Sequence, residues 1–178
     1  MSDLVQDYPR VLLTAEQIKK RVHEMARQIS DDFRDRTLCV VAVMENGFIF
    51  MADLVRLLDV PVVCQFVKAE FKETNPHMTE IFFSPEVAVD GHDVLLVEAL
   101  VQSGVTSDFL IRNLTGRGAR SVKLAVLLDK QSARRVEIQP DYFGFLMNED
   151  FVVGYGLGTP HLGRNLPYIA GPARPHRS

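Results

Sequence analysis

The chain has 178 residues, of which 47% are hydrophobic and 24% are charged, and its formal net charge is −3. This length suits one domain with a sizeable core, and the charge gives no positive field of the kind that nucleic-acid-coating proteins need. No apolar run reaches the length of a membrane span, about 18 residues. Met1 to Asp7 lacks the pattern of a secretory signal, so we expect a cytoplasmic protein with no nucleic-acid or membrane partner.

The first third of the chain predicts two helices and two strands. Thr14 to Gln17 has the pattern of a capping box, which opens a helix. Leu38 to Val43 is a continuous apolar run, typical of a strand covered on both faces. Gly47 to Leu58 predicts a helix that is apolar on more sides than a surface helix needs, and Val60 to Val67 predicts the next strand. The apolar face of the first helix consists of Ile18, Val22, Met25, Ala26 and Ile29.

The rest of the chain continues this alternation of strands and helices. Cys39 and Cys64 fall within the first two predicted strands, so we expect two buried, reduced thiols. The later strands are expected at His77–Phe83, Asp93–Val97, Val122–Leu128, Tyr142–Leu146 and Phe151–Tyr155, with a helix at Ser103–Leu114.

Alternating strands and helices predict an α/β fold with a doubly wound, mainly parallel sheet flanked by helices. We expect a single domain over residues 1–170, followed by a disordered tail, rich in Pro and Arg, over residues 171–178. Ligands of such sheets bind beyond the carboxyl ends of the strands. Functional side chains are therefore expected just after Val43, Val67, Val97 and Leu128.

The segment from Val94 to Thr106 is the most informative motif in the sequence. A buried strand leads into Glu98, and a short loop, Gln102-Ser103-Gly104-Val105-Thr106, then opens a helix. Because amides at a helix N-terminus attract anions, this loop is suited to a phosphate, and Glu98 is placed to accept hydrogen bonds from sugar hydroxyls. An ordinary strand-to-helix turn with a Ser and a Gly accounts for the same pattern equally well.

This segment resembles the phosphoribosyl-pyrophosphate (PRPP) motif of hypoxanthine-guanine phosphoribosyltransferases, in which two acidic and two apolar residues precede Asp-[Ser/Thr]-Gly-x-Thr. Three further segments resemble the same family in the same order, and the resemblance runs from about residue 9 to residue 170. These segments are NGFIFMADLVR at 46–56, LLDKQSARR at 127–135, and FVVGYGL with RNLPYI between 151 and 169. The resemblance implies the type I phosphoribosyltransferase fold, with a small hood region beside the sheet.

The resemblance also implies a role for each matching residue. The 5′-phosphate would lie against Ser103, Gly104, Val105 and Thr106, and Glu98 would contact the ribose hydroxyls. The purine would be read by Lys130, by stacking on Phe151 and by the backbone of Val152. Pyrophosphate would face Asn46, Gly47 and Arg164. The implied ligands are a purine nucleotide or PRPP, the implied metal is magnesium, and the implied assembly is a homodimer or homotetramer.

The sequence departs from the family pattern where chemistry is expected. The acidic pair is reduced to Glu98-Ala99, and Gln102 replaces the aspartate that serves as general base. Glutamine forms hydrogen bonds but cannot accept a proton at neutral pH. Gly158 replaces an aspartate that helps hold magnesium, so magnesium binding is expected to be weakened.

Two further departures lie in loops that the resemblance places around the reaction centre. Glu45 lies in the loop where the family has a lysine, and it would place a negative charge near a polyanion. The stretch Lys68 to Lys72 corresponds to the family's mobile loop, but it is short and lacks the usual Gly and Ser.

Three interpretations follow from these residues. The first is a protein that binds purine nucleotide or PRPP with weakened or lost transferase activity, because general acid–base help contributes about 10²–10⁴-fold to a rate. The alternative is an active purine salvage enzyme that makes IMP or GMP from hypoxanthine or guanine. The third is a purely structural subunit with an empty phosphate loop.

Overall fold

The computed structural model describes residues 8–71, 79–83, 87–159 and 163–173. Its centre is a six-stranded sheet with the strand order β4-β3-β2-β5-β6-β7. All neighbouring strands in this sheet are parallel except β3 and β4. The strands are β2 (Leu38–Met44), β3 (Val62–Phe71), β4 (Thr79–Phe83), β5 (Asp93–Val101), β6 (Ser121–Asp129) and β7 (Tyr142–Leu146).

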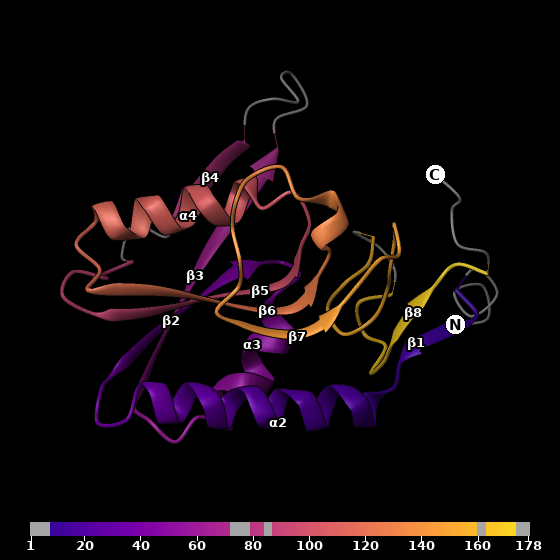
Figure 1. The fold of residues 1–178 in the computed structure, drawn as a ribbon, viewed down its shortest axis with the longest axis horizontal. Coiled ribbons are helices and arrows are strands. Elements are labelled where there is room, and N and C mark those ends of the chain that lie inside the picture. Colours follow the sequence, from indigo (N-terminus) through magenta and orange to yellow (C-terminus); the bar gives the residue numbers. More distant parts are fainter. Residues whose placement is uncertain (1–7, 72–78, 84–86, 160–162, 174–178) are drawn as a thin grey trace.

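Helices cover both faces of the sheet, as Figure 1 shows. Helix α4 (Val105–Gly116) lies on one face, and helices α2 (Ala15–Asp32) and α3 (Phe48–Val55) lie on the other. The buried residues accordingly form two apolar clusters, one on each side of the sheet. The predicted α/β fold with a doubly wound, mainly parallel sheet is therefore confirmed. No helix in the described part of the chain is both long and apolar enough to cross a membrane.

Helix α2 has the start and the buried face that its sequence predicts. The Thr14 hydroxyl accepts a hydrogen bond from the backbone N–H of Gln17, and the Gln17 side chain accepts one from the Thr14 N–H. This reciprocal pair satisfies two backbone donors that the first turn leaves without partners. The buried residues of the helix are the five predicted ones: Ile18, Val22, Met25, Ala26 and Ile29.

The two ends of the chain meet in a second, two-stranded antiparallel sheet of β1 (Arg10–Leu13) and β8 (Ile169–Gly171), which lies to one side of the main sheet (Figure 1). Gly171, which we assigned to the tail, is buried in β8 because it pairs with Arg10. Residues 174–178 of the expected tail lie outside the described residues. The prediction of a strand at Phe151–Tyr155 is wrong, since that segment forms two isolated bridges, Val153 with Ala170 and Gly154 with Leu157.

Several predicted boundaries shift because strand pairing extends them. Strand β3 continues to Phe71, through most of the stretch that we matched to a mobile loop, because it pairs with β4 from Val67 onward. Residue 72, and residues 77 and 78 of the strand predicted at 77–83, lie outside the described residues. Strand β5 continues to Val101 through its pairing with β6, and α4 begins at Val105 rather than at Ser103.

The two cysteines have different environments. Cys39 is buried as expected, but Cys64 is exposed. Cys64 lies on β3, which pairs with β4 only from Val67 onward, and nearby Val63 and Phe66 on this strand are each 45% exposed.

One of the connecting turns lies close to the predicted site. A 3₁₀ turn, η1 (Gln131–Ala133), follows β6 directly. It returns the chain toward the end of β5, where the predicted phosphate loop lies.

Candidate functional site

A pocket of about 320 Å³ lies where the sheet changes direction. The chain moves from β2 outward to β3 and then crosses to β5 on the other side of β2, so the carboxyl ends of β2 and β5 diverge. This divergence is the place where α/β sheets bind ligands. The pocket is lined by Val43, Met44, Asn46, Glu98, Leu100, Val101, Gln102, Ser103, Gly104, Thr106 and Ser107.

The predicted phosphate loop forms one wall of the pocket. Gly104 precedes the first residue of α4 and has φ of 78°, a left-handed conformation that a side chain disfavours. A Cβ at Gly104 would also lie 2.5 Å from Cγ2 of Ile138. Because Gly104 allows the backbone this turn, the loop and the N-terminus of α4 meet at the pocket, which is an arrangement that attracts anions.

Glu98 lies on β5 beneath this loop and is 8% exposed. Burial raises the pKa of the Glu98 carboxyl to about 7, while a hydrogen bond with Ser107 and the charge of Arg134 act in the opposite direction. Its Oε1 atom is buried and has no hydrogen-bond partner. A partly protonated carboxyl with a free oxygen can accept from, or donate to, a hydroxyl in the pocket.

Ala99, the next residue on β5, belongs to the apolar cluster on the α2 and α3 side of the sheet, where it is 2% exposed. Successive side chains of a strand point to opposite faces. Glu98 and residue 99 therefore face different sides of the sheet, so the acidic pair expected from the motif is reduced to one carboxyl in the pocket.

The residues predicted for pyrophosphate come together from distant parts of the chain. Arg164 Nη1 donates to the side-chain oxygen of Asn46 at 2.5 Å and to the backbone oxygen of Gly156 at 2.9 Å. Arg164 Nη2 also lies 3.4 Å from the carboxylate of Glu45. The negative charge of Glu45, which seemed unfavourable near a polyanion, is thus paired with an arginine.

Gly47 holds this corner of the site against the sheet. A Cβ at Gly47 would lie 2.8 Å from the backbone oxygen of Val43 and 3.3 Å from that of Val97. Because these are backbone atoms of β2 and β5, they cannot move aside. The absence of a side chain at Gly47 therefore allows α3 to start directly at the ends of both strands.

The residues predicted to read the purine lie beyond the described lining of the pocket. Lys130 is 8% exposed, and its Nζ donates to Asp150 at 2.7 Å. Its backbone N–H donates to the oxygen of Val101 at 2.9 Å, which places it beside the end of β5. Phe151 is 40% exposed and lies against Tyr8, with ring centroids 5.7 Å apart, and Val152 is buried.

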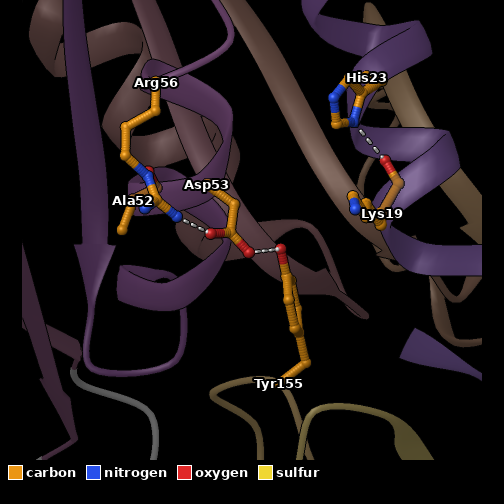
Figure 2. A network of polar contacts seen from close by, with 6 residues as sticks. All are labelled: Lys19, His23, Ala52, Asp53, Arg56 and Tyr155. Carbon is orange, nitrogen blue, oxygen red and sulfur yellow. Dashed lines mark hydrogen bonds and ion pairs between the residues drawn. The ribbon is translucent and has the colours of Figure 1, made fainter. Parts of the chain in front are cut away.

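A tether joins the segment after Phe151 to helix α3, as Figure 2 shows. The Tyr155 hydroxyl donates to Asp53 at 2.6 Å, and Asp53 also pairs with Arg56. A mainly apolar cavity of about 580 Å³ lies here, bordered by Lys19 and His23 of α2. This cavity shares no lining residue with the pocket at the ends of β2 and β5, so the tether does not line that pocket.

Sequence reasoning gave no role to Arg134, although this residue lies in a segment that resembles the family. Its guanidinium pairs with the buried carboxylate of Asp129 and donates to the backbone oxygen of Gln102 at 3.1 Å. The one sequence signal was a cation in the turn after Lys130, and most such cations are solvated.

The residues present do not fit a magnesium site built from protein carboxylates. Within the described residues, no group of three or more His, Cys, Asp or Glu side chains could hold a metal ion. Glu98 is the one carboxylate among the residues that line the pocket. Residue 99 is a buried alanine, and Gly158 has no side chain to offer.

Comparison with known proteins agrees with this geometry. Residues 11–159 match the sequence model of the phosphoribosyl transferase domain. The hypoxanthine-guanine phosphoribosyltransferase of Bacillus subtilis (strain 168) is 33% identical over 171 residues, which cover 92% of this chain and 92% of that protein. A crystal structure of a hypoxanthine-guanine phosphoribosyltransferase from Bacillus anthracis superposes with a TM-score of 0.87 at 32% identity, covering 93% of this chain and 99% of that one.

Some relatives are much longer than this chain. The bifunctional protein TilS/HprT of Listeria monocytogenes serotype 4b (strain F2365) is 34% identical over 171 residues, which cover 92% of this chain. The chain spans 26% of the length of that protein.

Proposed function

Because the chain belongs to the hypoxanthine-guanine phosphoribosyltransferase family, we propose that it is an active purine phosphoribosyltransferase. It would transfer the 5-phosphoribosyl group of PRPP to hypoxanthine or guanine and release pyrophosphate. One observation carries this proposal: the phosphate loop, Glu98 and the Asn46–Arg164 pair converge at one pocket between the ends of β2 and β5.

The proposed roles follow from the chemistry of each group. The amides of Ser103 to Thr106 and the N-terminus of α4 would hold the 5′-phosphate. Glu98 would accept a hydrogen bond from a ribose hydroxyl through its unpartnered Oε1. Arg164 would bind pyrophosphate oxygens, since a guanidinium offers paired donors to phosphate.

The base would lie beside Lys130 and Phe151. Lys130 is held by its hydrogen bond to Asp150, which would keep its side chain in place to donate to an exocyclic oxygen. Phe151 exposes enough of its ring to stack on a purine. Gln102, at the carboxyl end of β5, can position the base by hydrogen bonding but cannot exchange a proton with it.

The expectation of weakened or lost activity rests on departures from the family pattern at Glu45, Ala99, Gln102 and Gly158 and in the stretch Lys68 to Lys72. The family membership and the convergence of the predicted site residues favour an active enzyme with a reduced contribution from acid–base catalysis. The reaction is followed by the formation of IMP from hypoxanthine and PRPP in magnesium-containing buffer. We expect saturable turnover by the wild-type protein, and a faster rate for Gln102→Asp by up to about 10²-fold.

Two results would change this proposal. Absence of IMP formation by the wild-type protein, together with tight binding of IMP in calorimetry, would identify a nucleotide-binding protein without transferase activity. A Gln102→Asp variant no faster than Gln102→Asn would show that residue 102 contributes nothing by proton exchange.

A further inference from the structure

The turn that follows β6 holds the backbone of the phosphate loop from behind. Three successive carbonyl oxygens at the end of β5 accept hydrogen bonds from it. The donors are the N–H of Lys130 to Val101 at 2.9 Å, Arg134 Nη1 to Gln102 at 3.1 Å, and the N–H of Arg135 to Ser103 at 2.9 Å. Of these three donors, Arg134 Nη1 belongs to a side chain, and the other two are backbone N–H groups.

Holding these oxygens fixes where the loop amides point. In a planar trans peptide the C=O of one residue and the N–H of the next point in opposite directions. Because Arg134 draws the Gln102 oxygen toward the η1 turn, the N–H of Ser103 is turned away from that turn. Ser103 and Gly104 line the pocket, whereas Arg134 lines a neighbouring cavity of about 360 Å³ behind them.

The Arg134 side chain is itself held in place. Asp129, which is 1% exposed, pairs with its guanidinium through one oxygen and accepts from Gln131 Nε2 at 3.1 Å through the other. The two Nη groups of Arg134 therefore serve different partners, one the buried carboxylate and the other the loop carbonyl. A lysine has one nitrogen at the end of its chain and cannot span both in the same fork.

The Arg134 side chain also lies close to the backbone turn at Gly104. A Cβ on Gly104 would lie 3.1 Å from Cδ of Arg134. The arginine stem and the loop thus pack against each other, so a displaced guanidinium would leave space into which the loop could relax.

We propose that Arg134 is a positioning residue for phosphate binding: its bridge from Asp129 to the Gln102 carbonyl orients the Ser103 amide toward the 5′-phosphate. This inference rests on the proposed function for the identity of the ligand, although the bridge itself is a feature of the chain. The site of the base, beside Lys130 and Phe151, does not depend on the bridge.

The test compares Arg134→Lys with Arg135→Lys. Arg135 is exposed and contacts the loop through its backbone N–H, which the substitution keeps. Binding of ribose 5-phosphate is measured by calorimetry, and KM is measured separately for PRPP and for hypoxanthine. We expect Arg134→Lys to weaken ribose 5-phosphate binding and to raise the KM for PRPP about tenfold or more relative to Arg135→Lys. The KM for hypoxanthine and the melting temperature should be close to those of Arg135→Lys.

A double variant controls for the unpaired buried charge that a single substitution at Arg134 could leave on Asp129. Asp129→Asn combined with Arg134→Gln removes both charges and the bridge, and we expect the same loss of ribose 5-phosphate affinity. Backbone hydrogen exchange of the free protein is expected to be faster at the Arg135 amide in this double variant than in the wild-type protein.

The results separate this inference from the proposed function. A wild-type protein that binds ribose 5-phosphate but forms no IMP would reject the transferase, and loss of that binding in Arg134→Lys would still support the bridge. Equal ribose 5-phosphate affinity in Arg134→Lys and Arg135→Lys would overturn the inference. A parallel rise of both KM values with a lower melting temperature would overturn it as well, since that pattern indicates a general structural role.

Discussion

Replacing Glu98 with glutamine should stabilise the protein at neutral pH while weakening its binding of the sugar. Burial raises the pKa of the folded-state carboxyl from 4.5 to about 7. At about 1.4 kcal/mol per pKa unit, this shift corresponds to about 3 kcal/mol. A neutral glutamine of the same shape avoids that cost but offers no anionic oxygen to a ribose hydroxyl.

The pH dependence of this effect has a definite sign. Below pH 4.5 the carboxyl is protonated in both the folded and the unfolded chain, so burial costs little there. As the pH rises, the unfolded chain ionises first, and unfolding becomes steadily more favourable until the folded-state pKa of about 7 is passed. The stability that the protonated carboxyl provides is therefore lost between pH 4.5 and about 7.

Urea unfolding of the wild-type protein and of Glu98→Gln between pH 4.5 and pH 8.5 measures this difference. We expect the variant to gain up to about 3 kcal/mol in unfolding free energy relative to wild type as the pH rises. Glu137→Gln, at an exposed position, is the control and should stay within about 0.5 kcal/mol at every pH. A difference between Glu98→Gln and wild type that does not change with pH would refute the reasoning.

Three other substitutions test the phosphate loop, the Tyr155–Asp53 tether and the role of Arg164. Gly104→Ala places a Cβ at φ of 78° and 2.5 Å from a methyl carbon of Ile138, so it should lower the unfolding free energy by about 2 kcal/mol. Gly116→Ala, which has open space around it, is the control and should not lower it. Equal urea midpoints for the two variants would contradict the argument. Tyr155→Phe removes the 2.6 Å hydrogen bond to Asp53 and should cost about 1 kcal/mol in the same assay, with a loss near zero showing that the tether adds nothing. Arg164→Gln should raise the KM for PRPP about tenfold and leave the KM for hypoxanthine unchanged in steady-state assays; a change in both would argue against a pyrophosphate role.

Local patterns in the sequence predicted much of the fold. The capping box at Thr14 and the apolar spacing of α2 depend on residues three or four positions apart, and the structure reproduces both. The apolar runs of β2, β5 and β6 predicted these strands without any information on the strands beside them, because a strand covered on both faces is apolar throughout. The boundaries of β3 and β5 were set by pairing with distant strands, and there the sequence was less informative.

The order of motifs along the chain also predicted the strand, the glycine turn and the helix start around Ser103 to Thr106, and phosphate binding there stays a prediction. The strand, the glycine and the helix start are adjacent in sequence, so they could be predicted without a structure. The family membership rests on the same colinear motifs and on the comparisons that support them.

The tertiary structure alone decided how these motifs meet. Asn46 and Arg164 are 118 residues apart and form a direct hydrogen bond, and Arg134 reaches back 32 residues to the Gln102 carbonyl. The burial that raises the pKa of Glu98 arises from the sheet and α4 packing around it. Sequence spacing carries no direct signal for such contacts, because the distance between two loops depends on the order of strands in the sheet and not on the residues between them.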